Sequence, residues 1–140
     1  MSNHVHARAD ELIREFRFAS IGVIDEVGYP SVSAISLLAP QTISELYFST
    51  TLDSNKAKRL SMDSRASVNC FNENANITLV GDAEIISDPE SKAARWAAWV
   101  ALGLDIYPGG VDDPNYCYVR FTTKRASLWI DDQTVEFQLD

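Results

Sequence analysis

The sequence is poor in the residues from which self-sufficient catalytic sites are built. Its 140 residues include only two cysteines, Cys70 and Cys117, and two histidines, His4 and His6. Two cysteines cannot form a zinc site alone and do not indicate a disulfide framework. Both stand in strand-like segments, where a small buried thiol is expected. Two histidines at the N-terminus, with no third ligand nearby, predict neither a metal site nor a Ser-His-Asp triad.

Positive charge and long apolar runs are also scarce. Twelve lysine and arginine residues stand against 20 aspartate and glutamate residues, so the net charge is -8. This balance argues against nucleic acid, because phosphate backbones require a basic partner surface. No run approaches membrane-spanning length, and the N-terminal residues lack the apolar core of a signal peptide. We therefore expect a soluble, cytoplasmic protein without a membrane or nucleic-acid partner.

The familiar catalytic motifs are missing as well. The sequence contains no G-x-G-x-x-G that opens a helix, no P-loop and no G-x-S-x-G. Carboxylates are plentiful but scattered, and no pair stands at a spacing that would fix an acid and a base. An enzyme built from this chain would take its reactivity from a cofactor.

What the chain does contain is enough apolar sequence for one folded domain. Hydrophobic residues make up 46% of the composition, and a chain of this length can bury about two-thirds of its unfolded surface. No repeat or linker divides residues 1–140, which we expect to form a single domain. Alternating patterns predict strands, linked mostly by short turns, at residues 21–25, 31–38, 46–50, 66–70, 76–86, 116–122, 126–131 and 134–139.

Helical spacing predicts two to three helices. The first shows one apolar face after a frayed terminus, the second is short and basic, and the third begins at Asp88-Pro89-Glu90 in the usual order of cap, proline and acidic turn. Residues 107–115 are too rich in glycine, proline and aspartate for a regular element. The expected faces are Ala9, Leu12, Ile13 and Phe16 in the first helix, and Ala93, Trp96, Ala97, Val100 and Leu104 in the third. Trp96 and Trp99 are interpreted as packing residues.

Three strand features predict how the elements associate. Gly81 interrupts the longest strand and indicates a bulge or a close backbone approach. That strand is apolar on both faces, so it needs cover on two sides, as in a barrel or at a subunit interface. Trp129 points away from the face that Ala126, Leu128 and Ile130 share, so it is placed to cover a partner or a ring-shaped ligand. The pattern as a whole predicts a mainly β (α+β) antiparallel barrel with helices outside, and the two-sided strand favours a homodimer.

The stretch from residue 46 to residue 70 has the clearest binding potential. Ser54 can cap the helix that carries Lys56, Lys58 and Arg59. Hydroxyl groups and a lysine at a helix N-terminus form a natural anion seat. The alternative is that Ser54 only caps the helix and that the cations are solvated. The residues alone leave both interpretations open.

Five segments, in the same order, resemble the pyridoxamine 5'-phosphate oxidase-like superfamily of FMN-binding split barrels, and the general stress protein 26-type branch in particular. After Gly28-Tyr29-Pro30 these are LYFSTTLDSNKAKRL (46–60), DSRASVNCF (63–71), NITLVGDAEIISD (76–88), YPGGVDDPNY (107–116) and ASLWID (126–131). The resemblance implies a six-stranded Greek-key split barrel that forms a homodimer with two FMN sites at the subunit interface.

The resemblance also implies a set of site residues. The phosphate motif falls on Ser54, Asn55 and Lys56, with Lys56 as the charged ligand. The other implied contacts are a strand along the flavin (Phe48, Ser49), a backbone segment at the edge of the isoalloxazine ring (Ser33, Ala34, Ile35, Ser36), an amide that reaches the flavin or its ribityl chain (Asn76) and an aromatic from the partner subunit (Trp129). No catalytic acid or base is assigned.

The chain departs from the family pattern at three positions. Ser33, Leu38 and Asn55 are neutral where relatives often carry a cation, and the C-terminal arginine and histidine of the vitamin B6 oxidase are missing. We do not expect oxidase activity on vitamin B6. The first hypothesis is a homodimeric FMN-dependent oxidoreductase with an unknown substrate. The alternatives are a degenerate barrel that serves as a binding or stress-associated protein with weak or no flavin binding, and a relative that binds deazaflavin F420. Haem has little support, because both histidines are N-terminal.

Overall fold

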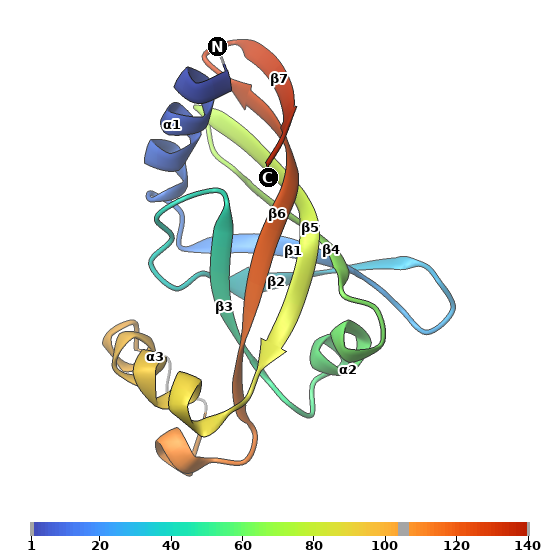
Figure 1. The fold of residues 1–140 in the computed structure, drawn as a ribbon, viewed down its shortest axis with the longest axis vertical. Coiled ribbons are helices and arrows are strands. Elements are labelled where there is room, and N and C mark those ends of the chain that lie inside the picture. The colour runs from blue at the N-terminus through green and yellow to red at the C-terminus, as the bar shows by residue number, and fades with distance from the viewer. Residues whose placement is uncertain (1, 104–106, 140) are drawn as a thin grey trace.

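The computed structural model describes residues 2–103 and 107–139, which fold around one antiparallel sheet (Figure 1). Three α-helices and one short 3-10 helix accompany seven strands in these residues. The elements, in chain order, are α1 (Ser2–Ile13), β1 (Phe18–Ile24), β2 (Pro30–Ser36), β3 (Glu45–Thr51), α2 (Asn55–Met62), β4 (Arg65–Phe71), β5 (Ala75–Ile86), α3 (Pro89–Ala101), η1 (Gly110–Asp112), β6 (Tyr116–Ile130) and β7 (Gln133–Gln138).

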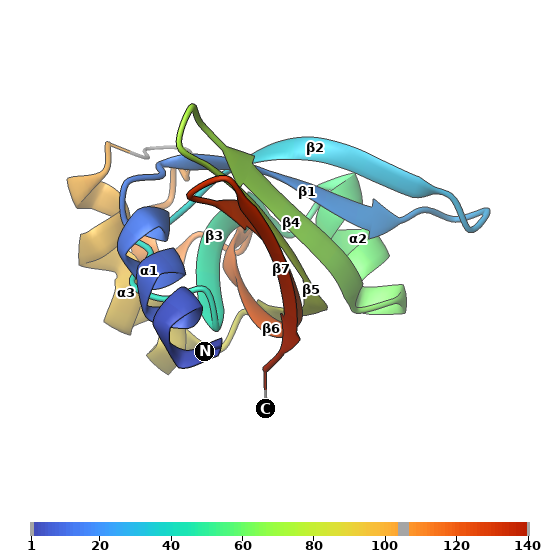
Figure 2. The ribbon, with the colours of Figure 1, turned by 90° about the horizontal axis from the view of Figure 1, so that it is seen from above.

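The sheet closes on itself into a loosely joined barrel. Its strand order is β2-β1-β4-β5-β6-β3, with β7 added to β6. The two ends of this order meet only at an isolated bridge between Leu37 and Phe48 and at the hydrogen bond from the Leu38 N–H to the Tyr47 carbonyl, 2.8 Å. Figure 2 shows the resulting curvature, with α1 and α3 on one side and α2 on the other. The predicted mainly β, antiparallel architecture with helices outside is confirmed.

β6 is one continuous strand, where the sequence pattern predicts two. It pairs with β5 along most of its length, with β3 through its first half and with β7 through its second half. The interruption appears instead as a register shift: Val80 faces Arg125 and Gly81 faces Thr123, so Lys124 has no partner in β5. The prediction of a bulge or a close backbone approach at Gly81 is confirmed, because the ladder shifts register there and a Cβ at Gly81 would lie 2.0 Å from the carbonyl oxygen of Thr122.

The final hairpin turns one residue earlier than predicted. Its two turn residues are Asp131 and Asp132, rather than Asp132 and Gln133, and both have positive φ, 52° and 61°. This is the mirror-image turn whose twist matches that of the flanking strands. Aspartate tolerates the left-handed region better than most residues, so two consecutive aspartates are suited to this turn.

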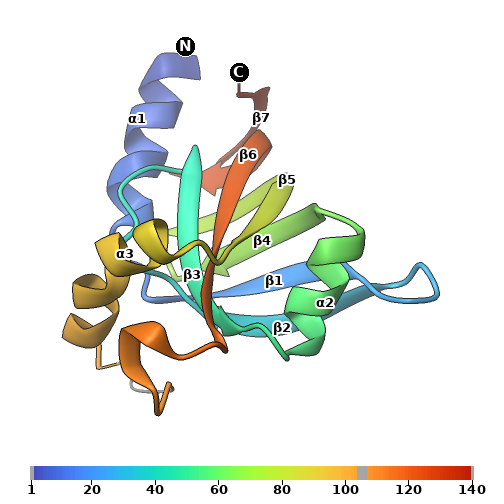
Figure 3. The same ribbon diagram turned by 60° about the horizontal axis from the view of Figure 1, so that its bottom comes forward.

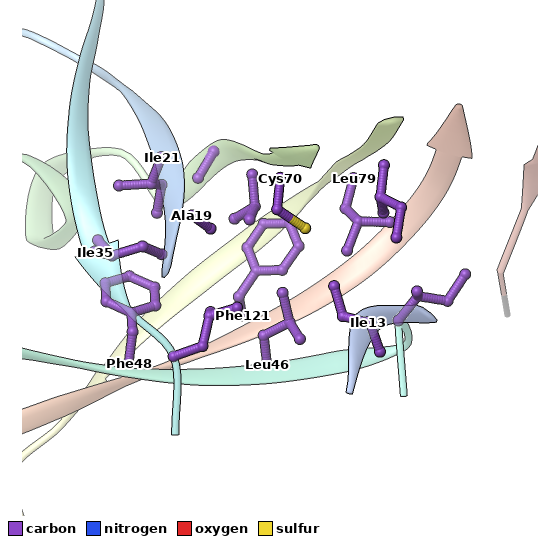
Figure 4. Packing of buried hydrophobic residues seen from close by; sticks show 14 of the residues in the cluster. Ile13, Ala19, Ile21, Ile35, Leu46, Phe48, Cys70, Leu79 and Phe121 are labelled. Carbon is purple, nitrogen blue, oxygen red and sulfur yellow. The ribbon is translucent and has the colours of Figure 1, made fainter. Parts of the chain in front are cut away.

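Buried side chains form two clusters. The larger fills the barrel and includes both Phe48 and Phe121, each 0% exposed, together with α1 (Figure 4). The second lies between α3 and the start of β6 and is largely aromatic: Leu38, Trp99, Tyr107, Tyr116 and Tyr118. Cys70 and Cys117 are both buried and form no disulfide, as predicted for interior thiols.

α1 starts earlier than expected. The residues predicted to be frayed are helical, and the helix spans Ser2–Ile13. Its predicted inner face is confirmed, because Ala9, Leu12 and Ile13 are buried and Phe16 packs beside them. The start of α1 lies beside the β6–β7 hairpin, where the His6 ring contacts the Phe137 ring at 5.7 Å between centroids. This contact links α1 to a strand at the other end of the chain.

α3 starts as predicted but buries a different face. Asp88 caps it by accepting a hydrogen bond from the Ser91 N–H at 3.0 Å. The residues turned inward are Lys92, Trp96 and Trp99. The predicted stripe is wrong at Ala93, Ala97 and Val100, which are exposed, and Leu104 lies outside the described residues.

The loop after α3 explains this choice of face. Tyr107 and Tyr116 pack against the Trp96 ring, at 6.2 Å and 5.0 Å between centroids. The segment predicted to contain no regular element includes the 3-10 helix Gly110–Asp112. Aromatic contacts with the following loop and with the start of β6 therefore outweigh the apolar spacing within α3. No helix of residues 2–103 or 107–139 is long and apolar enough to cross a membrane.

Candidate functional site

The first turn of α2 is held by Ser54. Its Oγ accepts a hydrogen bond from the Ala57 N–H at 3.0 Å and lies 2.9 Å from the hydroxyl of Thr50. The capping role is therefore confirmed, and the hydroxyl already has two partners. The N–H groups of Asn55 and Lys56 precede the capped one, and helix geometry gives them no acceptor within the helix. These two groups point out of the N-terminus of α2, where an anion is favoured.

Lys56 extends from this turn along β2. Its Nζ donates to the Ala34 carbonyl oxygen at 3.4 Å, a long and therefore weak hydrogen bond. Within the part of the chain that the structure describes, no carboxylate lies within ion-pair distance of this amine. Burial lowers the pKa of Lys56, because a half-buried ammonium loses hydration without gaining a counter-charge. The amine is thus a partly dehydrated cation that an anion would stabilise.

β2 presents the predicted ring-contacting segment at an edge of the sheet. Ile35 is buried in the barrel, Ser33 and Ala34 are exposed, and Ser36 is intermediate. β2 pairs with β1 on one side only before its end reaches β3. Half of its backbone groups therefore face away from β1, and the Ala34 carbonyl, which contacts Lys56, is one of them. Such groups are available to hydrogen-bond the edge of a planar ligand.

The neighbouring strand β3 contributes less than expected. Phe48 is 0% exposed and packs in the barrel core, so its side chain is closed to a ligand. Ser49 is half-buried on the opposite face of β3. Figure 3 shows β2, the end of β3 and α2 meeting in one region. These elements, with the cap of α2, carry the sequence-predicted residues Ser33, Ala34, Ile35, Ser36, Phe48, Ser49, Ser54, Asn55 and Lys56.

Asn76 and Trp129 lie elsewhere. They face each other across β5 and β6, and Trp129 is 37% exposed. β2 meets β3 at the Leu37–Phe48 bridge, and Phe48 faces Val119 of β6. Trp129 lies at the other end of β6, roughly 33 Å further along the strand. One protomer therefore does not bring these two residues to the Lys56 region.

Asn69 of β4 is a further polar residue, beside Asn76, and it was not predicted as a site residue. Its Nδ2 donates to Asn76 Oδ1 at 2.7 Å and to Thr78 Oγ1 at 2.9 Å. It thereby fixes the orientation of the Asn76 amide. The available signal was its position between the buried residues Val68 and Cys70, which turns it outward.

Between the two groups of residues, the outer face of the sheet is hollowed. The depression has a volume of about 530 Å³ and is lined by apolar side chains such as Val32 and Val80 and by the charged residues Arg65, Asp82 and Arg125. Arg59 of α2 binds Glu26 through two hydrogen bonds, 2.9 Å and 3.3 Å. From the sequence, Arg59 was predicted only as a cation of the short helix, with no role in a site.

A serine, a histidine and an aspartate do meet near the N-terminus, but not as a triad. His6 Nε2 lies 3.3 Å from Ser44 Oγ and 3.7 Å from Asp10 Oδ1, so the same nitrogen faces both groups. A triad requires two different ring nitrogens. Asp10 Oδ1 also accepts from the Ile43 N–H and the Thr42 hydroxyl. The described residues contain no group of three metal-ligating side chains.

Comparison with known proteins places this chain in a family. Residues 5–130 match the family described as pyridoxamine 5'-phosphate oxidase, while the curated proteins include no match. A Clostridium acetobutylicum protein related to general stress protein 26 of Bacillus subtilis has a similar structure. The TM-score is 0.82 at 24% identity, over 100% of this chain and 98% of that one.

Two further structures extend the comparison. General stress protein 26 from Bacillus anthracis superposes with a TM-score of 0.77 at 18% identity, over 97% of this chain and 99% of that one. A pyridoxamine 5'-phosphate oxidase-related, FMN-binding protein from Nostoc punctiforme gives a TM-score of 0.61 at 13% identity, over 99% and 95%. At these identities the structures establish the fold, and the sequence match over residues 5–130 establishes the family. The chain belongs to the pyridoxamine 5'-phosphate oxidase-like family of FMN-binding split barrels, and its structural neighbours include general stress protein 26 types.

Proposed function

We propose that this protein binds FMN at the region formed by α2 and β2, as a homodimer, and serves as a flavin-dependent oxidoreductase. The observation that carries the proposal is Lys56, a half-buried cation at a helix N-terminus that has no carboxylate partner among residues 2–103 and 107–139. A phosphate group there would meet the ammonium and the free N–H groups of Asn55 and Lys56. The edge of β2 from Ser33 to Ser36 offers backbone groups to the polar rim of the flavin.

The charge available for the phosphate is modest. Ser33 and Asn55 add no cation, and Leu38 is buried in the aromatic cluster. The overall charge of -8 does not help to attract an anion. The residues fit the group through local contacts, and we expect weaker binding than in relatives that carry two or three cations at these positions.

The second protomer completes the proposed site. Trp129 and Asn76 face each other at the far end of the β5–β6 ladder, roughly 33 Å along the strand from the point where β2 meets β3 and β6, so they would act on the cofactor of the partner. The same outer face exposes several large apolar side chains, namely Phe18 at 61%, Val32 at 69% and Phe71 at 72%. Exposed apolar patches of this kind are typical of protein interfaces. A second copy would cover them and place an indole over each ring.

When bound, FMN supplies the electron-transfer chemistry. The protein's own groups hold the phosphate, orient the ring and exclude water. The two thiols take no part, because burial raises the pKa of Cys70 to about 12 and that of Cys117 to about 11, which keeps both protonated.

A barrel without flavin is the second candidate, and one observation favours it. The Ser54 hydroxyl already serves as cap and as partner of Thr50, so it adds little to a phosphate seat. An F420-binding relative is the third, and competition between F420 and FMN would identify it. The visible spectrum of the purified protein, with mass spectrometry of any released ligand, separates these candidates.

Titration of the apoprotein with FMN and with riboflavin tests the proposal directly. Lys56→Gln should weaken FMN binding by about 10- to 100-fold, as expected for loss of one charge-assisted contact, and should leave riboflavin binding unchanged. The matched control is Lys58→Gln, because Lys58 is exposed on the same helix. A colourless protein whose thermal stability does not respond to FMN would refute the proposal. A monomer in light scattering would refute its dimeric part.

A further inference from the structure

Arg59 lies close to the position where this chain lacks a family cation. Its Nη1 is 3.3 Å from the hydroxyl of Ser31, while Glu26 binds the other side of the guanidinium. Ser31 and Ser33 occupy alternate positions of β2 and therefore project from the same face. Two strand residues span about 6.6 Å. The Arg59 guanidinium is thus roughly 10 Å or less from Ser33, close enough for the flexible arginine side chain to reach it.

Arg59 and Lys56 also share one face of α2. They are three residues apart, a spacing that makes side chains neighbours on a helix. Lys56 contacts β2 at Ala34 and Arg59 contacts it at Ser31, so both cations lie along the same edge of the sheet. An anion bound at the N-terminus of α2 would have one cation in place and the second within reach.

Glu26 is what holds Arg59 away from that point. The Glu26 side chain is 69% exposed, whereas that of Arg59 is 22% exposed. Asp25 adds a weaker attraction for the same guanidinium. Exposed ion pairs contribute little to stability, so exchanging this carboxylate for a phosphate would disturb the fold only slightly.

We propose that Arg59 is the second cation of the phosphate seat and that Glu26 competes with the phosphate for it. This inference rests on the proposed FMN site. It assigns to Arg59 the role of the cation that is missing at Ser33. A purely structural role is the alternative, in which the Arg59–Glu26 pair only attaches α2 to the β1–β2 hairpin. The two roles predict different signs for two substitutions.

The experiment measures FMN and riboflavin dissociation constants for wild type, Arg59→Gln, Glu26→Gln and the double variant. Arg59→Gln should weaken FMN binding about 10-fold or more. Glu26→Gln should tighten it by up to about 5-fold, because the competing carboxylate is gone. In the double variant, loss of Glu26 should have no further effect, since the group it competes for is absent. Riboflavin, which lacks the phosphate, should respond to none of these changes.

Ser33→Arg provides a rescue. Introduced into Arg59→Gln, it returns a cation to the family position and should restore most of the FMN affinity, whereas a structural defect would persist. Thermal unfolding of each variant checks that it is folded. If Arg59→Gln does not fold, Glu26→Gln decides the question alone, because it keeps Arg59 and should still tighten FMN binding.

The outcomes separate the two levels of the argument. If Lys56→Gln weakens FMN binding but the Arg59 and Glu26 variants shift it in the same direction, or not at all, the site stands and the role of Arg59 is refuted. If wild type binds FMN no more tightly than riboflavin, or binds neither, the phosphate seat itself is refuted and the inference falls with it.

Discussion

Gly81→Ala is the most direct perturbation of the bulge that shapes the barrel. A methyl group at this position would lie 2.0 Å from the carbonyl oxygen of Thr122, 2.9 Å from its carbonyl carbon and 3.0 Å from the Cα of Thr123. All three atoms belong to the backbone of β6, so no side-chain rotation relieves the contact. β5 and β6 must separate where they cross.

The size of the effect follows from that separation. Overpacking of a close-packed interior costs about 1–3 kcal/mol, and each strained or lost ladder hydrogen bond adds about 1 kcal/mol. We expect Gly81→Ala to lower the free energy of unfolding by about 3 kcal/mol or more, out of a total of about 5–15 kcal/mol. The melting temperature should fall by about 10 °C.

Gly22→Ala is the matched control. Its methyl group would meet Val32 Cγ2 at 3.7 Å and the Ser67 carbonyl oxygen at 4.0 Å, which are ordinary contacts. An alanine within a strand is favoured over glycine by about 0.5–1 kcal/mol, so this variant should be as stable as wild type or slightly more stable. Urea unfolding of all three proteins, at one protein concentration because association affects stability, gives the comparison.

The result that refutes the reasoning is specific. If Gly81→Ala unfolds within about 0.5 kcal/mol of wild type, the size of an ordinary surface substitution, the close approach at the bulge does not constrain the barrel. An equal loss of unfolding free energy in both variants would instead show that the sheet tolerates no added methyl group at either glycine. Gly81 would then be no more constrained than Gly22.

Three further substitutions or conditions test local claims. Ser54→Ala removes the cap of α2 and should cost about 1 kcal/mol in urea unfolding, and no loss would show that the cap is dispensable. The Arg65 guanidinium lowers the pKa of Asp63 to about 2. The stability that results is present above the unfolded-state pKa of about 3.9 and is lost as pH falls towards about 2. Asp63→Asn should therefore flatten this part of the acid-unfolding curve, and an unchanged curve would contradict the pairing. Cys70 and Cys117 should react with a thiol reagent at pH 8 only after unfolding, and rapid labelling of the native protein would contradict their burial.

Short-range sequence signals predicted the elements well. The caps Ser54 and Asp88, the bulge at Gly81 and the outward direction of Trp129 all depend on neighbouring residues, and the structure has each of them. The errors arose where remote contacts decide. Apolar spacing within α3 favoured the Ala93 and Val100 face, but the aromatic loop and β6 select the opposite face, with Lys92 and its long aliphatic stem turned inward.

The candidate site divides in the same way. Lys56 was singled out by its motif, and the structure places its amine against the Ala34 carbonyl of β2. Arg59 was not singled out, because the role proposed for it depends on Ser31 and Glu26, about 30 residues away in sequence, and no local pattern carries that proximity. The separation of Trp129 from β2 likewise follows only from the pairing of the strands and its register.

The continuity of β6 has a consequence for how the molecule loses its structure. The first half of this strand carries Tyr116 and Tyr118 in the aromatic cluster, its second half carries Ala126 and Leu128 in the barrel cluster, and the strand pairs with three other strands. Neither half can therefore melt while the other stays intact, and the domain should behave as a single cooperative unit. Amide protons in the middle of β6 should exchange with solvent only through global opening, while those at the start of α1 and at the β1–β2 turn exchange through local fraying.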